Sequence, residues 1–304
     1  MSNGKTVIAL TGATGFVGSG VLDLLLEQGY QVRCLVRRGS RHKMVMHRNS
    51  YWVEGGLADW EGLGELVDGA DVVLHMAGLI TARTKSDYEE VNSIAVDTLA
   101  RAAYKANVGR FVYLSSLAAK APDLSLYAWS KREGEYSLKN SFPKDKSVIV
   151  RAPAVFGAED VATAPIYACI RRGFLPAPGG RGWQKRLLSL IHVDDLAEFL
   201  AKICVSQLHD GETVSPSTRA AISWPDFAAA CSSARGEEVK AIPLPLSLLY
   251  PVAGLTTLTK AITGKGHLTL GKLGEFLYDD WSVEAGLQSD TDFSLALKKT
   301  LDPK

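Results

Sequence analysis

The chain has 304 residues, of which 46% are apolar, so it can bury a large core in one large or two smaller domains. With 34 basic and 33 acidic residues its formal net charge is +1, so no single-sign field suggests nucleic acid or an acidic membrane as a partner. The four cysteines form no CxxC pair, so buried thiols are expected rather than disulfides or a zinc site.

Short runs rich in Val, Ile and Leu alternate with helical patterns through the first half of the chain. Near-continuous apolar runs are typical of strands in a parallel sheet that is covered on both faces. The expected strands are 6–10, 31–36, 71–76, 110–115 and 147–152, and the expected helices are 16–28, 86–106 and 126–139. This alternation predicts an α/β fold of the Rossmann type, with a doubly wound parallel sheet.

The pattern loosens after about residue 155. Residues 174–183, "FLPAPGGRGW", are expected to be a loop, and 216–304 mostly short helices. We therefore predict a dinucleotide-binding domain and a smaller, mostly helical substrate lobe. The expected domain is 1–155 with 187–215 returning to it, and the expected lobe is 156–186 and 216–304.

The longest weakly charged segment is 241–262, "AIPLPLSLLYPVAGLTTLTKAI". Its prolines and hydroxyl groups argue against a membrane-spanning helix. The segment packs as a lid or lines an apolar pocket between the lobes, and contact with a membrane stays open.

The stretch "TVIALTGATGFVGSG" (6–20) predicts a strand, a glycine-rich turn and a helix. Gly12 permits a tight turn, Gly15 lets the backbone approach a pyrophosphate, and Gly18 lets helix and strand pack closely. Free N–H groups at the start of the helix would hold the phosphates. The turn is thus predicted to bind a dinucleotide, through Gly12, Thr14, Gly15, Phe16, Val17 and Gly18.

The end of the second expected strand indicates which dinucleotide is used. An NAD site usually has an acidic residue there, whereas this chain has Val36 followed by Arg37 and Arg38. A guanidinium group can pair with the 2′-phosphate of NADP(H) through two hydrogen bonds. NADP(H) is therefore the preferred cofactor, with NAD(H) and a merely solvated basic loop as the alternatives.

Tyr127 and Lys131 lie one helical turn apart in "SLYAWSKREGE". A lysine ammonium group at that position favours the phenolate and lowers the tyrosine pKa. Of ten tyrosines only Tyr127 has a lysine four positions later. Ser115 and Ser116 end the preceding expected strand, where a hydroxyl group that orients a substrate is required. A surface helix pattern is the alternative to a catalytic pair.

Together these segments resemble the short-chain dehydrogenase/reductase superfamily, in its extended, epimerase/dehydratase-like branch. In the order typical of that family, the matching segments are "TGATGFVG", "HMAG" (75–78), "VNSIAVDTLARAA" (91–103), "FVYLSS", "YAWSK", "RAPAVFG" (151–157) and "IHVDDLA" (191–197). "VRCLVRR" is similar to dihydroflavonol-reductase-like members. "SSLAAKAPDLSLYAWSKREGE" looks like the atypical branch related to the 39 kDa complex I accessory subunit.

The resemblance implies a role for each matching residue. Tyr127 would be the general acid for reduction of a carbonyl group, or the base for oxidation of an alcohol. Lys131 would bind the nicotinamide ribose, and Ser116, or less favourably Ser115, would hydrogen-bond the substrate oxygen. Asn92 would support the geometry of the site. Further cofactor contacts implied are Ala77, Gly78, Pro153 and Val155.

Two departures bear on the substrate. Ser116 and Tyr127 are 127 − 116 = 11 positions apart, fewer than is usual in sugar-nucleotide enzymes, and no Tyr-Gly pair follows the serines. We therefore favour an NADP(H)-dependent oxidoreductase that reduces a ketone or aldehyde, or oxidises the alcohol, of an apolar small molecule. The alternatives are a nucleotide-sugar epimerase or dehydratase, and a non-catalytic assembly protein like the complex I accessory subunit.

Other features are interpreted as structural. His75 and His192 are expected to be packed, Asp194 and Asp195 to start a helix, and no His/Cys/carboxylate cluster indicates a metal. The expected partner is a small-molecule substrate, without nucleic acid or a transmembrane segment, and a homodimer stays open. "MSNGKTVIAL" lacks the pattern of a signal peptide, so a cytoplasmic location is expected.

Overall fold

The computed structural model describes residues 6–263 and 269–302, and the chain divides into two compact units. The first unit consists of Met1–Pro122, Tyr127–Arg151 and Leu196–Val214. The second consists of Asp123–Leu126, Ala152–Asp195 and Ser215–Lys304. The return to the first unit begins at Leu196 rather than at 187, because residues 187–192 pair with strands of the second unit.

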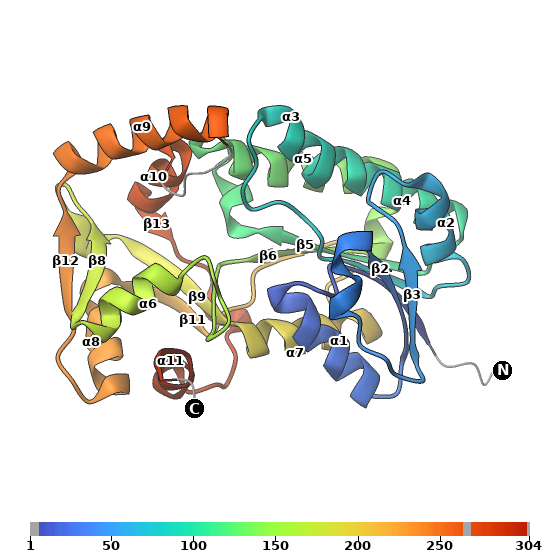
Figure 1. Cartoon of the computed structure of the whole chain (residues 1–304). Helices are drawn as coiled ribbons and strands as arrows, with labels where there is room; N and C mark the ends of the chain where they lie inside the picture. The colour runs from blue at the N-terminus through green and yellow to red at the C-terminus, as the bar shows by residue number, and fades with distance from the viewer. Residues whose placement is uncertain (1–5, 264–268, 303–304) are drawn as a thin grey trace. The chain divides into compact units, whose positions relative to one another are not determined.

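A seven-stranded sheet forms the centre of the first unit (Figure 1). Its strand order is β10-β6-β5-β4-β1-β2-β3, and the pairs of β1 with β2, β1 with β4, and β4 with β5 are parallel. The order reverses between β1 and β4, which confirms a doubly wound, Rossmann-type sheet. The strands are β1 (Val7–Thr11), β2 (Gln31–Val36), β3 (Ser50–Glu54), β4 (Val72–His75), β5 (Arg110–Ser116), β6 (Ser147–Ala152) and β10 (Thr213–Val214).

Helices cover this sheet, and residues 86–106 are more complex than one expected helix. They fold as two short helices joined by a π-helical turn, Glu90–Ile94. The main core of the unit packs Leu63, Leu99 and Leu138 from three helices against Phe111 of β5. The helices are α1 (Phe16–Glu27), α2 (Trp60–Val67), α3 (Lys85–Glu89), α4 (Ala95–Lys105), α5 (Leu126–Ser141) and α7 (Val193–Val205).

The sequence analysis missed β3 because its pattern is weak. β3 is an edge strand of the sheet, and only Val53 of its five residues is buried. An edge strand with one buried side chain has no apolar run to reveal it. The short 3₁₀ turns of this unit are Arg38–Lys43, Leu117–Lys120 and Lys144–Lys146, and Pro122–Leu124 lies at its boundary.

The second unit contains two small sheets, so the expectation of a mostly helical lobe was incomplete. One sheet consists of β7 (Ala154–Phe156), β9 (Leu187–His192), β11 (Arg219–Ser223) and β13 (Asp280–Trp281), and the other of β8 (Phe174–Pro178) and β12 (Lys240–Leu244). The helices are α6 (Ala164–Arg171), α8 (Trp224–Arg235), α9 (Leu246–Thr263), α10 (Leu270–Leu277) and α11 (Phe293–Leu301), and short turns lie at Trp183–Lys185 and Ala285–Leu287.

The expectation that residues 174–183 form a loop was wrong for their first half. Phe174–Pro178 pairs in parallel with Lys240–Leu244, although both strands contain proline. In a two-stranded sheet each strand has an outer edge, where the missing N–H group of proline breaks no ladder hydrogen bond. Among residues 6–263 and 269–302, no helix is long and apolar enough to cross a membrane.

Candidate active site

The glycine-rich turn after β1 has a backbone that side chains would disrupt. Gly12 has a φ of +83°, and a Cβ added there would lie 2.8 Å from the amide nitrogen of Ala77. A Cβ on Gly18 would lie 2.0 Å from the carbonyl oxygen of Gly12, so helix α1 packs directly on the turn. These contacts match the predicted roles of Gly12 and Gly18.

The start of α1 has the chemistry that a phosphate group requires. Gly15 is the N-cap residue, no side chain caps the helix, and its first turn has no acidic residue. The N–H groups of a helix start and its partial positive charge favour an anion. Thr14, Phe16 and Val17 are partly exposed around this turn. The uncapped helix start beside this glycine turn therefore fits a dinucleotide phosphate.

Thr11 and His75 join the ends of β1 and β4 beneath this turn. Their Oγ1 and Nδ1 atoms are 2.7 Å apart, and the Ala77 amide donates a 3.2 Å hydrogen bond to Thr11 Oγ1. His75 is fully buried and stacks on Tyr113 at a centroid distance of 5.6 Å. Burial lowers the pKa of His75 to about 3, so the ring is neutral and supports the loop that contains Ala77.

Arg37 and Arg38 are exposed directly after the carboxyl end of β2. Glu54 ends the neighbouring strand β3, opposite Val36 in the register, and forms an ion pair with Arg41. The carboxylate at this edge of the sheet is thus neutralised by a third arginine.

Asn92 links the loop after β4 to helix α5. Its Oδ1 accepts a 2.8 Å hydrogen bond from the Leu79 amide, and its Nδ2 donates to the Leu79 carbonyl at 2.8 Å and to Ser130 Oγ at 2.9 Å. Asn92 lies in the π-helical turn, a conformation that is frequent at functional sites. Its contacts hold Gly78 close, since a Cβ on Gly78 would lie 3.0 Å from Asn92 Oδ1.

Lys131 is the buried centre of the predicted catalytic set. Its Nζ donates a 2.9 Å hydrogen bond to the Leu114 carbonyl and lies 4.6 Å from the centroid of the Tyr113 ring. A Cβ on Gly78 would be 3.7 Å from this Nζ, so the loop after β4 passes beside the ammonium group. Burial lowers the pKa of Lys131 to about 8, while the Glu135 carboxylate opposes that shift.

Tyr127 lies in the first turn of α5, one helical turn before Lys131. It is half-buried, and its ring centroid is 6.4 Å from that of Tyr88. Ser116 is also partly exposed, and its Oγ accepts a 3.2 Å hydrogen bond from the Ala118 amide. In this contact Ser116 is the acceptor, and its role toward a substrate oxygen stays a prediction.

Ser115 points into the core and has a different partner. It is buried and donates a 2.7 Å hydrogen bond to Oε1 of Glu135. Successive residues of a strand face opposite sides of the sheet, which separates Ser115 from Ser116. This geometry supports Ser116 over Ser115 as the substrate-orienting hydroxyl.

Sequence reasoning missed Glu135 and Arg151. Arg151 donates two hydrogen bonds to the fully buried Glu135 carboxylate, at 2.8 and 2.6 Å. The available signal was an acidic residue one turn after Lys131 on the same helix face. Its partner on β6 could not be identified, because 16 positions separate the two residues.

Pro153 and Val155, the two remaining predicted cofactor contacts, belong to the second unit. Pro153 is buried, and Val155 lies in β7, where it pairs with Ile191 of β9. The structure does not bring them together with the glycine turn within one unit. Their cofactor role therefore stays a prediction.

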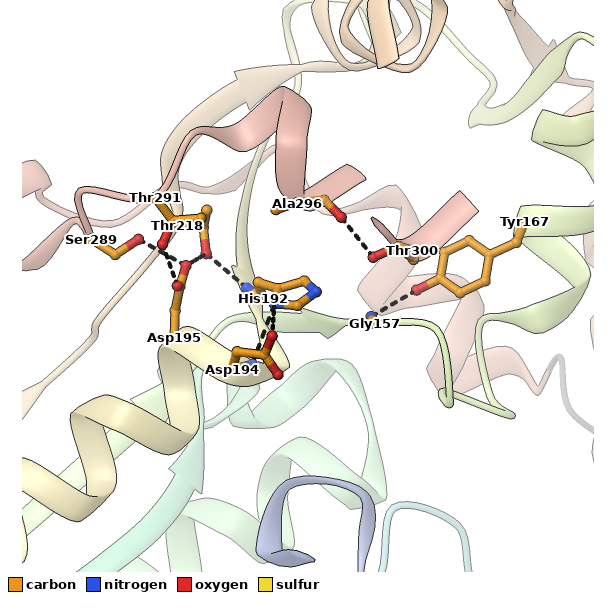
Figure 2. A network of polar contacts seen from close by, with 10 residues as sticks. All are labelled: Gly157, Tyr167, His192, Asp194, Asp195, Thr218, Ser289, Thr291, Ala296 and Thr300. Atoms are coloured by element: carbon orange, nitrogen blue, oxygen red, sulfur yellow. Dashed lines mark hydrogen bonds and ion pairs between the residues drawn. The ribbon is translucent and has the colours of Figure 1, made fainter. Parts of the chain in front are cut away.

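The "IHVDD" segment forms a polar network within the second unit, shown in Figure 2. The buried Asp195 accepts hydrogen bonds from Thr218, from Ser289 at 2.8 Å and from Thr291 at 2.5 Å. It thus ties the chain near residues 289–291 to the start of α7, which is more than the expected helix-starting role.

His192 is packed beside this network. Its ring centroid lies 5.1 Å from that of Phe156, and its amide donates to Thr218 Oγ1 at 2.7 Å. Burial lowers its pKa, against the opposing effect of Asp194 and Asp195. These contacts fit the structural interpretation of His192. Across the part of the chain that the structure describes, no group of three metal-ligating side chains occurs.

Comparison with known proteins gives a consistent family. Residues 8–214 match the model of the NAD dependent epimerase/dehydratase family. The chain is 32% identical over 283 residues to a ceramide reductase of Caulobacter vibrioides, covering 92% of this chain and 87% of that protein. It is 30% identical over 209 residues to the 4-hydroxy-2-methyl-3-oxo-4-farnesyl-3,4-dihydroquinoline-1-oxide ketoreductase of Stigmatella aurantiaca, covering 62% and 61% of the two chains.

The fold agrees with solved structures. The crystal structure of gox2253 superposes with a TM-score of 0.72 at 22% identity, covering 98% of this chain and 97% of that one. The family match spans the glycine turn, Tyr127 and Lys131, and the two relatives named above are reductases. The chain therefore belongs to the NAD-dependent epimerase/dehydratase family, and it is an NAD(P)-dependent oxidoreductase of the short-chain dehydrogenase/reductase type.

Proposed function

We propose that this protein uses NADPH to reduce a ketone on an apolar, ceramide-like lipid. The observation that carries the proposal is the set of Ser116, Tyr127 and Lys131 in a chain that matches most of the length of a ceramide reductase. In this reaction the ketone becomes a secondary alcohol. A bound NAD(P)H supplies the hydride for the carbonyl carbon.

The chain's own residues orient the ketone and supply the proton. The Ser116 hydroxyl donates a hydrogen bond to the ketone oxygen, and Tyr127 gives its phenolic proton to that oxygen as charge develops. Lys131 is fixed by the Leu114 carbonyl, and its ammonium group stabilises the phenolate left on Tyr127. Asn92 holds the loop after β4 and the Ser130 turn of α5 in place.

The preference for NADPH is supported by the charges at the end of β2. Val36 offers no carboxylate to a ribose hydroxyl, and Glu54 is neutralised by Arg41. Arg37 and Arg38 remain exposed beside this edge and suit a 2′-phosphate.

The substrate class is supported by the two relatives described above. The first relative is a ceramide reductase, and the second is a ketoreductase of a farnesylated 3-oxo-dihydroquinoline. Both of these compounds carry large apolar groups. Neither has the diphosphate of a nucleotide sugar, which would require several charged partners in its site.

The test measures loss of NADPH absorbance with three compounds at matched concentration. These are a long-chain N-acylated 3-ketone, its short-chain analogue and UDP-glucose. We expect turnover of both ketones, a lower KM for the long-chain one, and no turnover or thermal stabilisation with UDP-glucose. Stabilisation by UDP-glucose without turnover of any ketone would contradict the proposal and favour the epimerase or dehydratase alternative.

A further inference from the structure

Helix α9 of the second unit has an exposed apolar stripe among its described side chains. Its described side chains, 246–257 and 259, are all uncharged. Leu249 and Ala253 are buried in a small core with Leu273 of α10. A second stripe, Leu248, Val252 and Leu255, has the spacing i, i+4, i+7 and is exposed by 60%, 41% and 64%.

An ordinary surface helix has charged or polar side chains on its outer face. On α9 the exposed stripe is apolar instead. Leu270 of α10, 48% exposed, lies beside α9, since its amide donates a 2.9 Å hydrogen bond to Thr257 Oγ1. Tyr250 on another side of α9 and Ile242 on β12 are further exposed apolar side chains of this unit. Within the second unit, α9 and α10 lie side by side in Figure 1. Exposed apolar side chains gathered in this way mark an interaction surface.

The sequence between Glu238 and Glu275, which contains α9, is basic, although the whole chain is nearly neutral. Between Glu238 and Glu275 there is no carboxylate, and the segment contains four lysines, at 240, 260, 265 and 272. Lys240 and Lys272 pair with the flanking Glu238 and Glu275 at 3.4 and 2.9 Å. Such partly exposed pairs are weak, and with both flanking glutamates counted residues 238–275 keep a formal charge of 4 − 2 = +2. This charge complements an anionic lipid surface.

The same helix pair is packed against the chain just before Tyr127. Ser125 Oγ donates a hydrogen bond to Glu275 of α10. A Cβ on Gly271 would lie 2.9 Å from that of Ser125, and one on Gly274 would lie 3.2 Å from the Leu124 carbonyl oxygen. Segment 123–126 therefore forms one packed body with α9 and α10, and the predicted proton donor is the next residue along the chain.

We propose that the α9 face, defined as Leu248, Val252 and Leu255, docks on the surface of an anionic lipid bilayer, from which the lipid substrate is taken. The choice of a lipid bilayer as the partner rests on the proposed function. The helix would lie in the headgroup region rather than span the bilayer, since it carries an internal proline and is too short and polar to cross it.

The test is co-sedimentation of the full chain with phosphatidylglycerol/phosphatidylcholine vesicles and with pure phosphatidylcholine vesicles. We compare wild type with Leu248→Glu, Leu255→Glu and the double variant. The matched control is Leu295→Glu, because Leu295 is a 53% exposed leucine on helix α11 of the same unit. The glutamate would stand in the first turn of α11, where an acidic residue is favourable.

Wild type should bind the anionic vesicles and lose binding as salt is raised. Each α9 substitution should lower the partition coefficient roughly tenfold or more, since burial of a leucine side chain contributes about that factor. Leu295→Glu should bind like wild type. Equal binding of the wild type and the double variant would overturn the proposal, as would an equal loss in the Leu295 control.

Turnover of a short, water-soluble ketone separates this proposal from the proposed function. The α9 variants should keep that turnover with an unchanged KM. A wild type that reduces the soluble ketone but ignores vesicles refutes docking alone, whereas vesicle binding without any reductase activity refutes the proposed function alone. A raised KM, or a dimer that dissociates in the variants by light scattering, would assign the face to substrate or to a second copy and overturn the proposal.

Discussion

Arg151 of β6 holds the Glu135 carboxylate of α5 by two hydrogen bonds, with Nε–Oε1 at 2.8 Å and Nη2–Oε2 at 2.6 Å. Oε1 also accepts the Ser115 hydroxyl at 2.7 Å, so one carboxylate joins α5, β5 and β6. Lys131 lies one turn before Glu135 on the same helix. The ion pair thus fixes the helix that carries Tyr127 and Lys131 against the end of the sheet.

The first prediction is that the contributions of Glu135 and Arg151 to the free energy of unfolding are coupled. Glu135→Gln should lower the free energy of unfolding by about 3–5 kcal/mol, because it leaves the Arg151 guanidinium partly buried without its counter-charge. In a double-mutant cycle with Arg151→Met, urea unfolding should show less loss in the double variant than the sum of the singles. Arg101→Met is the control, since its pair with Asp97 has side chains 61% and 34% exposed and should cost under about 1 kcal/mol. An additive cycle would contradict the coupling.

Tyr127→Phe tests the proton donor. The substitution keeps the ring that packs near Tyr88 and removes only the hydroxyl, so folding and cofactor binding should be retained. The turnover number with NADPH and ketone should fall by about 10²–10⁴-fold, the usual contribution of a positioned general acid. Tyr136→Phe, a half-exposed tyrosine on the same helix, should behave like wild type. Retention of more than about a tenth of the rate would exclude this role.

Lys131→Met should separate activity from stability. The folded pKa of Lys131, about 8, is below its ordinary value of 10.5, so its contribution to stability is fully present above pH 10.5 and is lost as the pH falls through 8. At about pH 7 the buried ammonium group is therefore costly, and the inactive variant should be as stable as wild type or more so.

The difference in unfolding free energy between wild type and Lys131→Met, followed against pH, tests the direction of the Lys131 pKa shift. Between about pH 8 and 10 wild type should gain up to about 3 kcal/mol relative to the variant, measured by urea unfolding. A difference that is constant with pH would show that Lys131 has an ordinary pKa in the folded protein.

Arg37→Ala tests the choice of cofactor. Loss of the guanidinium group should weaken NADPH binding by about 1.5–3 kcal/mol, the range for a hydrogen bond to a charged group, and leave NADH binding nearly unchanged. Titration of cofactor fluorescence measures both affinities. Arg48→Ala, an exposed arginine before β3, is the control and should change neither. Equal affinity of wild type for the two cofactors would rule out the NADPH preference.

Because His75 is buried and neutral, we expect the folded protein to lose stability in acid. Its folded pKa, about 3, is below its ordinary value of 6.5, so its contribution to stability is present above pH 6.5 and is lost as the pH falls toward 3. In wild type this group should cost up to about 1.4 kcal/mol for each pH unit within that range. His75→Gln has no group that titrates at this position. Its free energy of unfolding, measured with urea, should therefore fall less between pH 6.5 and 3 than that of wild type. An equal loss of unfolding free energy in the variant over this pH range would show that other groups cause the sensitivity to acid.

Local sequence was sufficient to predict the main features of the first unit. The strands near 6–10, 31–36 and 71–76, the positive φ of Gly12, the packing of Gly18 on Gly12, and the spacing of Tyr127 and Lys131 were predictable, because each depends on neighbours within one or two turns of the chain. Periodicity and glycine geometry are local properties. The preference for Ser116 over Ser115 came from the family resemblance and stays a prediction, and the structure adds that only Ser115 is buried against Glu135.

Tertiary structure decided what depends on distant partners. β8 and β12 pair across 66 positions, for example Phe174 with Lys240, and only that pairing makes strands of two proline-containing segments. Glu135 is a structural anchor because Arg151 and Ser115 reach it, and Asp195 because Thr218, Ser289 and Thr291 do. A buried carboxylate is stable only where the fold supplies its donors, and no local pattern specifies which donors those are.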